Sequence, residues 1–264
     1  MKIAVYQLAP EFGDKQRNLN RIEKAVQTAG ADLVVLPELC ATGYQFTSRS
    51  EAADLCESIP EGESIRKLID LSRKHNCHIV AGVGEKAGDA LYNSAVLTGP
   101  DGVIGLYRKV HLFWDEKLWF QPGDLGFPVW DIGNAKIGIM ICFDWIFPEA
   151  ARSLALAGAD VICHPVNLVL PYCQDAMVTR CVENRIFIVT ANRIGTEARG
   201  GRDPLTFTGG SQIVDPRGNI QFRMASDAED LQACEIDPTL ARDKQITPCN
   251  HLWEDRRPDQ YEAG

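Results

Sequence analysis

Cys142 stands where an apolar run meets a segment with the features of a helix start. The run 135–141 before it is typical of a buried strand. After it, Pro148 and Glu149 suit a first helical turn, where proline needs no N–H and an acid faces the positive end of the dipole. A thiol in this field favours the thiolate form. Cys142 is therefore a candidate nucleophile, although a free cysteine can equally be a small core residue.

Two charged residues could serve such a nucleophile. Glu38 follows an apolar strand and could accept the proton of a thiol. Lys109 follows the apolar run 103–108 and could stabilise an oxyanion, while a buried lysine would also lower a thiol pKa. Either could instead be an ordinary turn or strand-end residue. Cysteine nucleophiles usually have a histidine base, for which His111 and His164 are candidates.

Alternating helix and strand patterns surround these residues and predict an α/β fold. In the first half we expect helices 17–29 and 63–75 and strands 2–8, 32–36, 78–84, 91–98 and 103–108. In the second half we expect a helix 174–185 and strands 135–141, 158–165, 186–191, 210–214, 219–224 and 230–236. Ligands gather at the carboxyl ends of strands in α/β sheets. Glu38, Lys109, Cys142 and 164–167 all follow such ends, so one pocket could contain them.

The second half partly repeats the first. Lys136-Ile137-Gly138-Ile139 echoes Lys2-Ile3-Ala4-Val5, and Gly158–Pro165 echoes Gly30–Pro37. Two similar halves predict two sheets packed face to face, with helices outside.

Composition limits the classes of partner. The 264 residues are 45% hydrophobic and show no linker, which predicts a single domain over 1–264. The net charge is −9 with scattered Lys and Arg, so we expect neither nucleic acid nor a membrane as partner. Nine cysteines without paired spacing, and no signal-like start, predict a cytoplasmic protein with reduced thiols. His75, Cys77 and His78 have no second ligand pair at zinc-site spacing, and we expect no metal site.

Several motifs resemble those of the nitrilase superfamily of carbon–nitrogen hydrolases. The three main ones are Leu36-Pro37-Glu38, Arg108–Phe113, and Ile141–Asp144 followed by Phe147–Arg152. Further similar segments are Phe120–Asp124, Glu183–Arg185, Asn192 and Gly210–Gly218.

The resemblance implies a role for each motif residue. Glu38 would be the general base, Lys109 the oxyanion lysine and Cys142 the nucleophile, with the backbone N–H of Phe143 as a second oxyanion donor. Glu116 occupies the place of a second glutamate that positions substrate or supports the lysine. The implied reaction is amide hydrolysis through a thioester, with no metal or organic cofactor.

The resemblance also implies an architecture and an assembly. The expected fold is a four-layer α-β-β-α sandwich of two mixed sheets with a pseudo-two-fold repeat. A homodimer would form through the helices after the nucleophile, with a higher homo-oligomer as the alternative, and a tail of about 249–264 would contact the partner.

Within the superfamily, the compact chain and Phe143 in place of tryptophan favour an amidase. An N-carbamoyl amidohydrolase or a nitrilase is the alternative. An arginine that would bind a dicarboxylic amide is missing, because Trp145 and Ile146 follow the Cys-x-Asp motif. An acyl or carbamoyl transferase and a non-catalytic binding protein on the same fold are rivals of other classes.

Aromatic residues near the motifs predict a partly apolar pocket for a small-molecule amide. The candidate substrate-binding residues are Tyr44, Trp114, Phe120, Trp145 and Asn167. Each could instead be an ordinary wall or turn residue.

Overall fold

Two six-stranded sheets form the centre of the computed structural model, which describes residues 1–261. The first sheet has the order β14 (Asp230–Glu235), β1 (Lys2–Gln7), β2 (Leu33–Val35), β3 (His78–Ala87), β4 (Ala90–Gly99) and β5 (Gly102–Arg108). The second has the order β13 (Ile220–Arg223), β12 (Gln212–Val214), β9 (Phe187–Ala191), β8 (Val161–Pro165), β7 (Lys136–Ile139) and β6 (Val129–Asp131).

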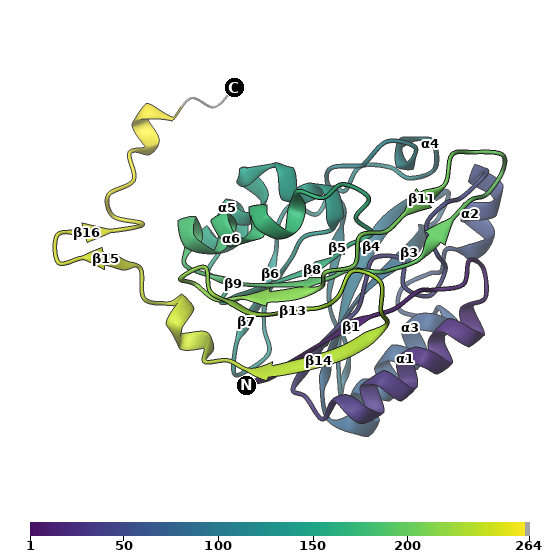
Figure 1. Cartoon of the computed structure of the whole chain (residues 1–264), viewed down its shortest axis with the longest axis horizontal. Coiled ribbons are helices and arrows are strands. Elements are labelled where there is room, and N and C mark those ends of the chain that lie inside the picture. Colours follow the sequence, from purple (N-terminus) through teal and green to yellow (C-terminus); the bar gives the residue numbers. More distant parts are fainter. Residues whose placement is uncertain (262–264) are drawn as a thin grey trace.

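Helices cover the outer faces of both sheets (Figure 1). The helices are α1 (Lys15–Ala29), α2 (Arg49–Leu55), α3 (Glu63–His75), α4 (Glu116–Trp119), α5 (Pro148–Leu156) and α6 (Cys173–Asn184). The pair α1 and α3 lies outside the first sheet, and α5 and α6 lie outside the second. The result is the predicted α-β-β-α sandwich. No helix within residues 1–261 is long and apolar enough to cross a membrane.

The two sheets have the same construction, which confirms the predicted internal repeat. Each contains three neighbouring parallel strands, β1-β2-β3 or β7-β8-β9. Each continues into two antiparallel strands, β4-β5 or β12-β13. The other edge is one antiparallel strand, which is β14 beside β1 and β6 beside β7. The strand β14 therefore comes late in the sequence but forms an edge of the first sheet, whose other strands all lie within residues 2–108.

The strands are buried on both faces, as expected for sheets covered by helices. On β1, Ile3 and Val5 belong to the core between the sheets, together with Ile139 of β7. Ala4 and Tyr6 point the other way, into a second core that includes α1 and α3. The sheets are thus fixed against each other and against their helices by alternate side chains of the same strand.

Long, periodic segments agree best with the sequence prediction. Helix α3 has the predicted bounds and ends at Asn76, which is in the left-handed region. Helix α1 begins earlier than predicted, because the side chain of Asp14 accepts a hydrogen bond from the backbone N–H of Arg17 and caps the helix. No helix or strand was predicted at α2, at β6 or at the small hairpin of β10 (Thr196–Glu197) and β11 (Leu205–Thr206).

The chain after β14 runs outward from the sandwich (Figure 1). It contains a short helical turn, Pro238–Ala241, and a hairpin of β15 (Gln245–Thr247) and β16 (Asn250–His251). The guanidinium of Arg152 on α5 lies 5.1 Å from the ring centroid of Trp253. The last three residues of the predicted tail, 262–264, lie outside the described residues.

Candidate active site

The ends of four strands bring the predicted reactive residues together. Glu38 follows β2, Lys109 directly follows β5, Cys142 follows β7 and Asn167 follows β8. Parallel strands end at the same edge of a sheet, and β5 runs in the same direction as β3 because two antiparallel pairings separate them. The sandwich thus gathers residues from both halves at one place.

Lys109 lies between two carboxylates. Its Nζ donates hydrogen bonds of 2.7 Å to Glu38 Oε1 and of 2.7 Å to Glu116 Oε1. The Lys109 and Glu38 side chains are fully buried, and that of Glu116 is 3% exposed. Burial alone would lower the pKa of Lys109, but the two carboxylates outweigh it and raise that pKa above its usual value. Lys109 is therefore a permanent cation at this site.

Only one of the two carboxylate oxygens of Glu38 is hydrogen-bonded within residues 1–261. Oε1 accepts the Lys109 bond and a 2.7 Å bond from Asn93 Nδ2. Oε2 is buried and has no hydrogen-bond partner within residues 1–261. Buried polar atoms are normally paired, so an unpaired carboxylate oxygen indicates a place for a proton donor from outside these residues or for a transferred proton.

Glu116 is held by four donors. Besides Lys109, the hydroxyl of Tyr44 donates a 2.6 Å bond to Oε1. The Phe113 backbone N–H and Asn93 Nδ2 donate to Oε2 at 3.3 and 3.5 Å. Burial, opposed by Lys109, raises the pKa of Glu116. Glu116 is thus fixed beside Lys109 and extends the network to the wall of a cavity at Tyr44.

Cys142 begins a short 3-10 helix, Cys142–Ile146, with a φ of +41°. This left-handed conformation is unusual for a residue with a side chain and needs support from its surroundings. Asp144 supplies part of that support, because its Oδ2 accepts bonds from the Ile141 backbone N–H at 2.8 Å and from the Tyr107 hydroxyl at 2.7 Å. Its Oδ1 accepts from the backbone N–H and Nδ1 of His111, at 3.1 and 2.8 Å.

His164 supports the same turn from β8. Its Nε2 lies 3.0 Å from the carbonyl oxygen of Cys142. A carbonyl can only accept, so Nε2 carries the proton in this bond. Burial lowers the pKa of His164 to about 4, and the ring is neutral at pH 7. His111 thus bonds the carboxylate of Asp144, and His164 bonds the backbone carbonyl of Cys142. Both candidate bases therefore support the turn that holds the nucleophile.

The expected thiolate at Cys142 is wrong for the resting protein. Burial, with the negative charge of Glu38, raises the pKa of the Cys142 thiol well above its usual value. Lys109 and the backbone N–H of Asn167 act in the opposite direction but are weaker. The helix α5 begins only at Pro148, after the 3-10 turn. Cys142 is therefore a protonated thiol that needs a base.

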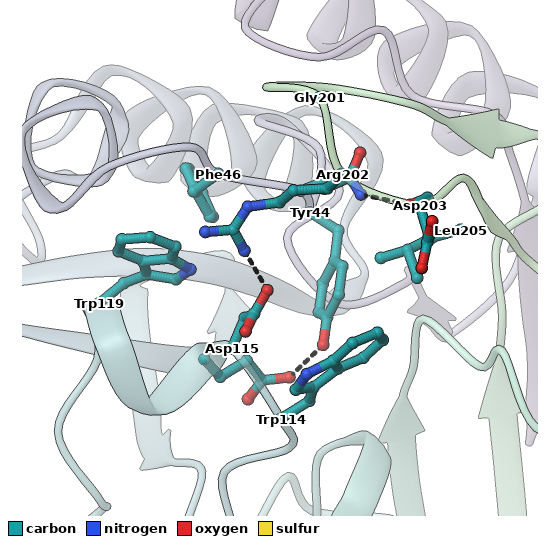
Figure 2. A pocket seen from close by; sticks show the side chains of 11 residues that line it. Tyr44, Phe46, Trp114, Asp115, Trp119, Gly201, Arg202, Asp203 and Leu205 are labelled. Atoms are coloured by element: carbon teal, nitrogen blue, oxygen red, sulfur yellow. Dashed lines mark hydrogen bonds and ion pairs between the residues drawn. The ribbon is translucent and has the colours of Figure 1, made fainter.

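Two hollows border this network. A small one, of about 10 Å³, is lined by Phe113, Cys142, Phe143, Trp145 and Asn167 with the segment 168–170. A larger one, of about 290 Å³, is lined by Tyr44, Trp114, Asp115, Glu116, Trp119 and Arg202, among others. In Figure 2, the dashed line from the Tyr44 hydroxyl marks its hydrogen bond to Glu116 at the wall of this larger cavity. The larger cavity borders the network at Glu116, which bonds Lys109, and the small hollow borders it at Cys142.

The comparisons with known proteins identify the family. Residues 2–245 match the family model described as carbon-nitrogen hydrolase. A relative from Pyrococcus abyssi, named nitrilase, is 48% identical over 99% of both chains.

The chain belongs to the carbon–nitrogen hydrolase family.

Solved structures agree with this carbon–nitrogen hydrolase in fold. One from Helicobacter pylori, itself called a carbon-nitrogen hydrolase, has a TM-score of 0.87 and 28% identity, covering 99% of this chain and 96% of that one. An amidase from Nesterenkonia has a TM-score of 0.80 and 26% identity, covering 98% and 97%. That amidase was solved as a mutant in which acrylamide has added to the active-site cysteine. The present protein is accordingly an enzyme that hydrolyses carbon–nitrogen bonds.

The predicted substrate-binding residues of this carbon–nitrogen hydrolase occupy different environments. Tyr44 and Trp114 line the larger cavity, and Trp145 and Asn167 line the hollow at Cys142. Asn167 is 2% exposed, and neither amide atom of its side chain has a partner within residues 1–261. Phe120 lines neither hollow and packs against Phe46 in a core cluster.

Sequence reasoning missed four residues of the hydrolase site. Asn93 donates a hydrogen bond to Glu38, and Asp144 accepts one from the backbone N–H of Ile141, next to Cys142. Asp115 and Arg202 form an ion pair at the larger cavity. A signal existed for Asn93, since a polar side chain inside the apolar strand 91–98 needs a buried partner. Arg202 gives no such signal, because it lies in a Gly-rich loop far along the chain from Asp115.

Proposed function

We propose that this enzyme hydrolyses a small-molecule amide to a carboxylic acid and ammonia through a thioester on Cys142. Glu38 acts as general base, Lys109 stabilises the oxyanion, and Glu116 holds Lys109 in place. The unpaired Oε2 atom of Glu38 carries the proposal, since it is a buried acceptor beside a protonated thiol.

In the acylation step, the Cys142 proton moves to Glu38 as the sulfur attacks the amide carbon. The carbonyl oxygen becomes an oxyanion. An ammonium has three donors, and the hydrogen bonds to Glu38 and Glu116 occupy two of those of Lys109. The remaining N–H and the backbone N–H of Phe143 would stabilise the oxyanion, and one such donor is typically worth about 3–4 kcal/mol. Glu38 then protonates the departing ammonia, leaving the thioester.

In the deacylation step, Glu38 takes a proton from water, and the resulting hydroxide attacks the thioester. The tetrahedral intermediate collapses, the acid leaves, and the proton returns to the sulfur. One carboxylate thus serves both steps, which suits a site where Asn93 and Lys109 fix one oxygen and leave the other free.

Nitrile hydrolysis is the second candidate. The relative from Pyrococcus abyssi that is named nitrilase supports it. Attack of the same sulfur on a nitrile carbon gives a thioimidate, which two waters convert to the same acid and ammonia. Phe143, in place of the tryptophan typical of nitrilases, supports the amide.

The test is ammonia release by the purified enzyme from matched amides, ureido acids and nitriles, beside Cys142→Ala. We expect amides to be the best class and the variant to be inactive. Faster release from nitriles or ureido acids would replace the amide assignment. Equal activity in Cys142→Ala would exclude the thioester mechanism.

We also propose a homodimer formed through α5, α6 and the tail from residue 249. Large apolar side chains are exposed on these segments, including Leu156 and Val182. Light scattering of the full chain and of a chain ending at residue 248 tests the assembly, and a monomeric full chain would contradict it.

A further inference from the structure

The larger cavity already contains a positively charged group. Arg202 lies in the loop between β10 and β11 and extends its guanidinium into the space beside Trp119 (Figure 2). The guanidinium carbon is 5.2 Å from the centroid of the Trp119 ring, and a terminal nitrogen bonds a carboxylate oxygen of Asp115. A ring face and a carboxylate are the two partners that bind an organic cation in water. The Arg202 guanidinium thus occupies the position, between Trp119 and Asp115, that such a ligand cation would occupy.

The arrangement allows Arg202 to leave. It follows Gly200 and Gly201, both in the left-handed region, at the end of a two-strand hairpin. The Arg202 and Asp115 side chains are 29% and 39% exposed, so solvent reaches the ion pair and weakens it. A ligand cation that enters from solvent can therefore displace the guanidinium.

The rest of the wall favours a cation over an anion. Asp203 also lines the cavity, and its carboxylate accepts no side-chain hydrogen bond within residues 1–261. A carboxylate ligand bound to Arg202 would leave Asp115 without its partner. It would also bring three negative groups together, which are the ligand, Asp115 and Asp203. A cation on Asp115 leaves Arg202 free to extend into water. The net charge of −9 attracts cations to the enzyme in either case.

We propose that Asp115 and Trp119 form a subsite for the positively charged end of the substrate, from which that end displaces Arg202. The substrate class is an amide with an ammonium or guanidinium group at the end away from the scissile bond. This inference rests on the proposed amide hydrolysis, because the subsite lies beside Glu116 and Trp114 at the open end of the reacting site.

The experiment uses straight-chain amides from butanamide to hexanamide, each with a methyl, an ammonium or a carboxylate group at the far end. The kcat/KM of each is measured for the wild type, Asp115→Asn, Arg202→Ala and a control, Asp175→Asn. Asp175 pairs with Arg223 on the surface, at 2.9 Å, away from the cavity residues, so its loss tests the general effect of one negative charge.

We expect the ammonium amide of the best length to exceed its methyl counterpart about tenfold in kcat/KM, which corresponds to one charge-assisted contact. Arg202→Ala should increase that ratio, because it removes the competing cation. Asp115→Asn should abolish the ratio, and Asp175→Asn should leave it unchanged. A preference for the carboxylate amide that Arg202→Ala abolishes would overturn the proposal, as would equal rates for all three ends.

Binding to Cys142→Ala protein, measured by calorimetry with the same amides, separates the two levels of inference. If no amide is hydrolysed by the wild type but the ammonium amides bind more tightly in an Asp115-dependent way, the subsite stands and the proposed reaction fails. If amides are hydrolysed but neither rate nor binding depends on the ammonium, the reaction stands and the subsite fails.

Discussion

The buried end of the reacting site, at Cys142 and Lys109, and the open end, at Trp114 and Arg202, are held in place differently. Lys109 and Glu38 are fully buried, and they are oriented by each other, by Asn93 on β4 and by Glu116 at the start of α4. Trp114 is 60% exposed, and Arg202, in the loop between two two-residue strands, is held by a partly exposed ion pair with Asp115 and by the ring of Trp119.

This difference separates the residues proposed to break the bond from those proposed to select the substrate. At the buried end, charges are balanced within a low-dielectric interior, where a small displacement is costly. At the open end, partners are exchangeable, and substitution there should alter which substrate binds more than how the bond breaks. The following predictions test that separation.

Glu38→Gln should have the largest effect. The amide retains the bonds from Lys109 and Asn93 but cannot accept the thiol proton, so kcat for an amide should fall about 10³-fold. Steady-state ammonia release measures it, with Glu61→Gln, an exposed site, as control. Activity near that of the wild type would show that another group is the base.

Gly82→Ala should impair catalysis through the backbone alone. A Cβ at Gly82 would lie 2.3 Å from Glu38 Cα and 2.8 Å from the backbone nitrogen of Leu39, so the loop must move. We expect a loss of about 100-fold in kcat and about 1–3 kcal/mol of stability.

Gly84→Ala is its matched control on the same strand. There the new Cβ would meet Cys56 Sγ at 2.7 Å, away from Glu38. It should cost comparable stability in urea unfolding but retain most activity. Equal loss of activity in both variants would mean that crowding of β3, and not the position of Glu38, is responsible.

Tyr44→Phe should have a moderate effect, because Tyr44 joins the two ends. Its hydroxyl donates to Glu116, which already has three other donors, so the network is weakened but not lost. We expect kcat to fall about tenfold, the value of one hydrogen bond to a charged group. Tyr172→Phe, at an exposed site, should be unchanged, and a Tyr44→Phe enzyme with full kcat would exclude this link.

Acid should weaken the attachment of the hairpin at the open end. Glu51 accepts bonds from Arg199, which lies in the same loop as Arg202, and these lower its pKa from 4.5 to about 2. Since the folded-state pKa lies below the unfolded value, its contribution is complete above pH 4.5 and is lost as the pH falls toward 2.

The measurement is the difference in unfolding free energy between wild type and Glu51→Gln. It should be constant from pH 7 to 5 and shrink between pH 4.5 and 2. A difference that does not change with pH would contradict the role of the Glu51 charge.

The sequence predicted what depends on local pattern and on motifs. The periodicity of 63–75 predicted α3, and the echo of Lys2–Val5 in Lys136–Ile139 predicted two sheets packed face to face. The three motifs predicted that Glu38, Lys109 and Cys142 would meet, and the strand ends bring them together.

Features that depend on tertiary surroundings were missed or wrong. The thiolate prediction at Cys142 considered the helix but not burial beside Glu38, which a sequence does not reveal. Nor does the place of Phe120 in the segment 120–124 reveal that its ring contacts Phe46 edge-on. The pairing of Asp115 with Arg202 depends on a hairpin whose strands are too short to show an alternation of apolar and polar residues.

The position of β14 has a consequence for the order of folding. Its residues 230–235 pair with β1, and the Met1 ammonium donates to the carbonyl oxygen of Ile236 at 2.8 Å. During synthesis, β1 therefore has one unpaired edge until residues 230–235 have been made. Such long-range pairing slows folding and leaves an edge open to other chains. β14 thus covers one edge of β1, and a chain truncated before residue 230 should be prone to aggregation.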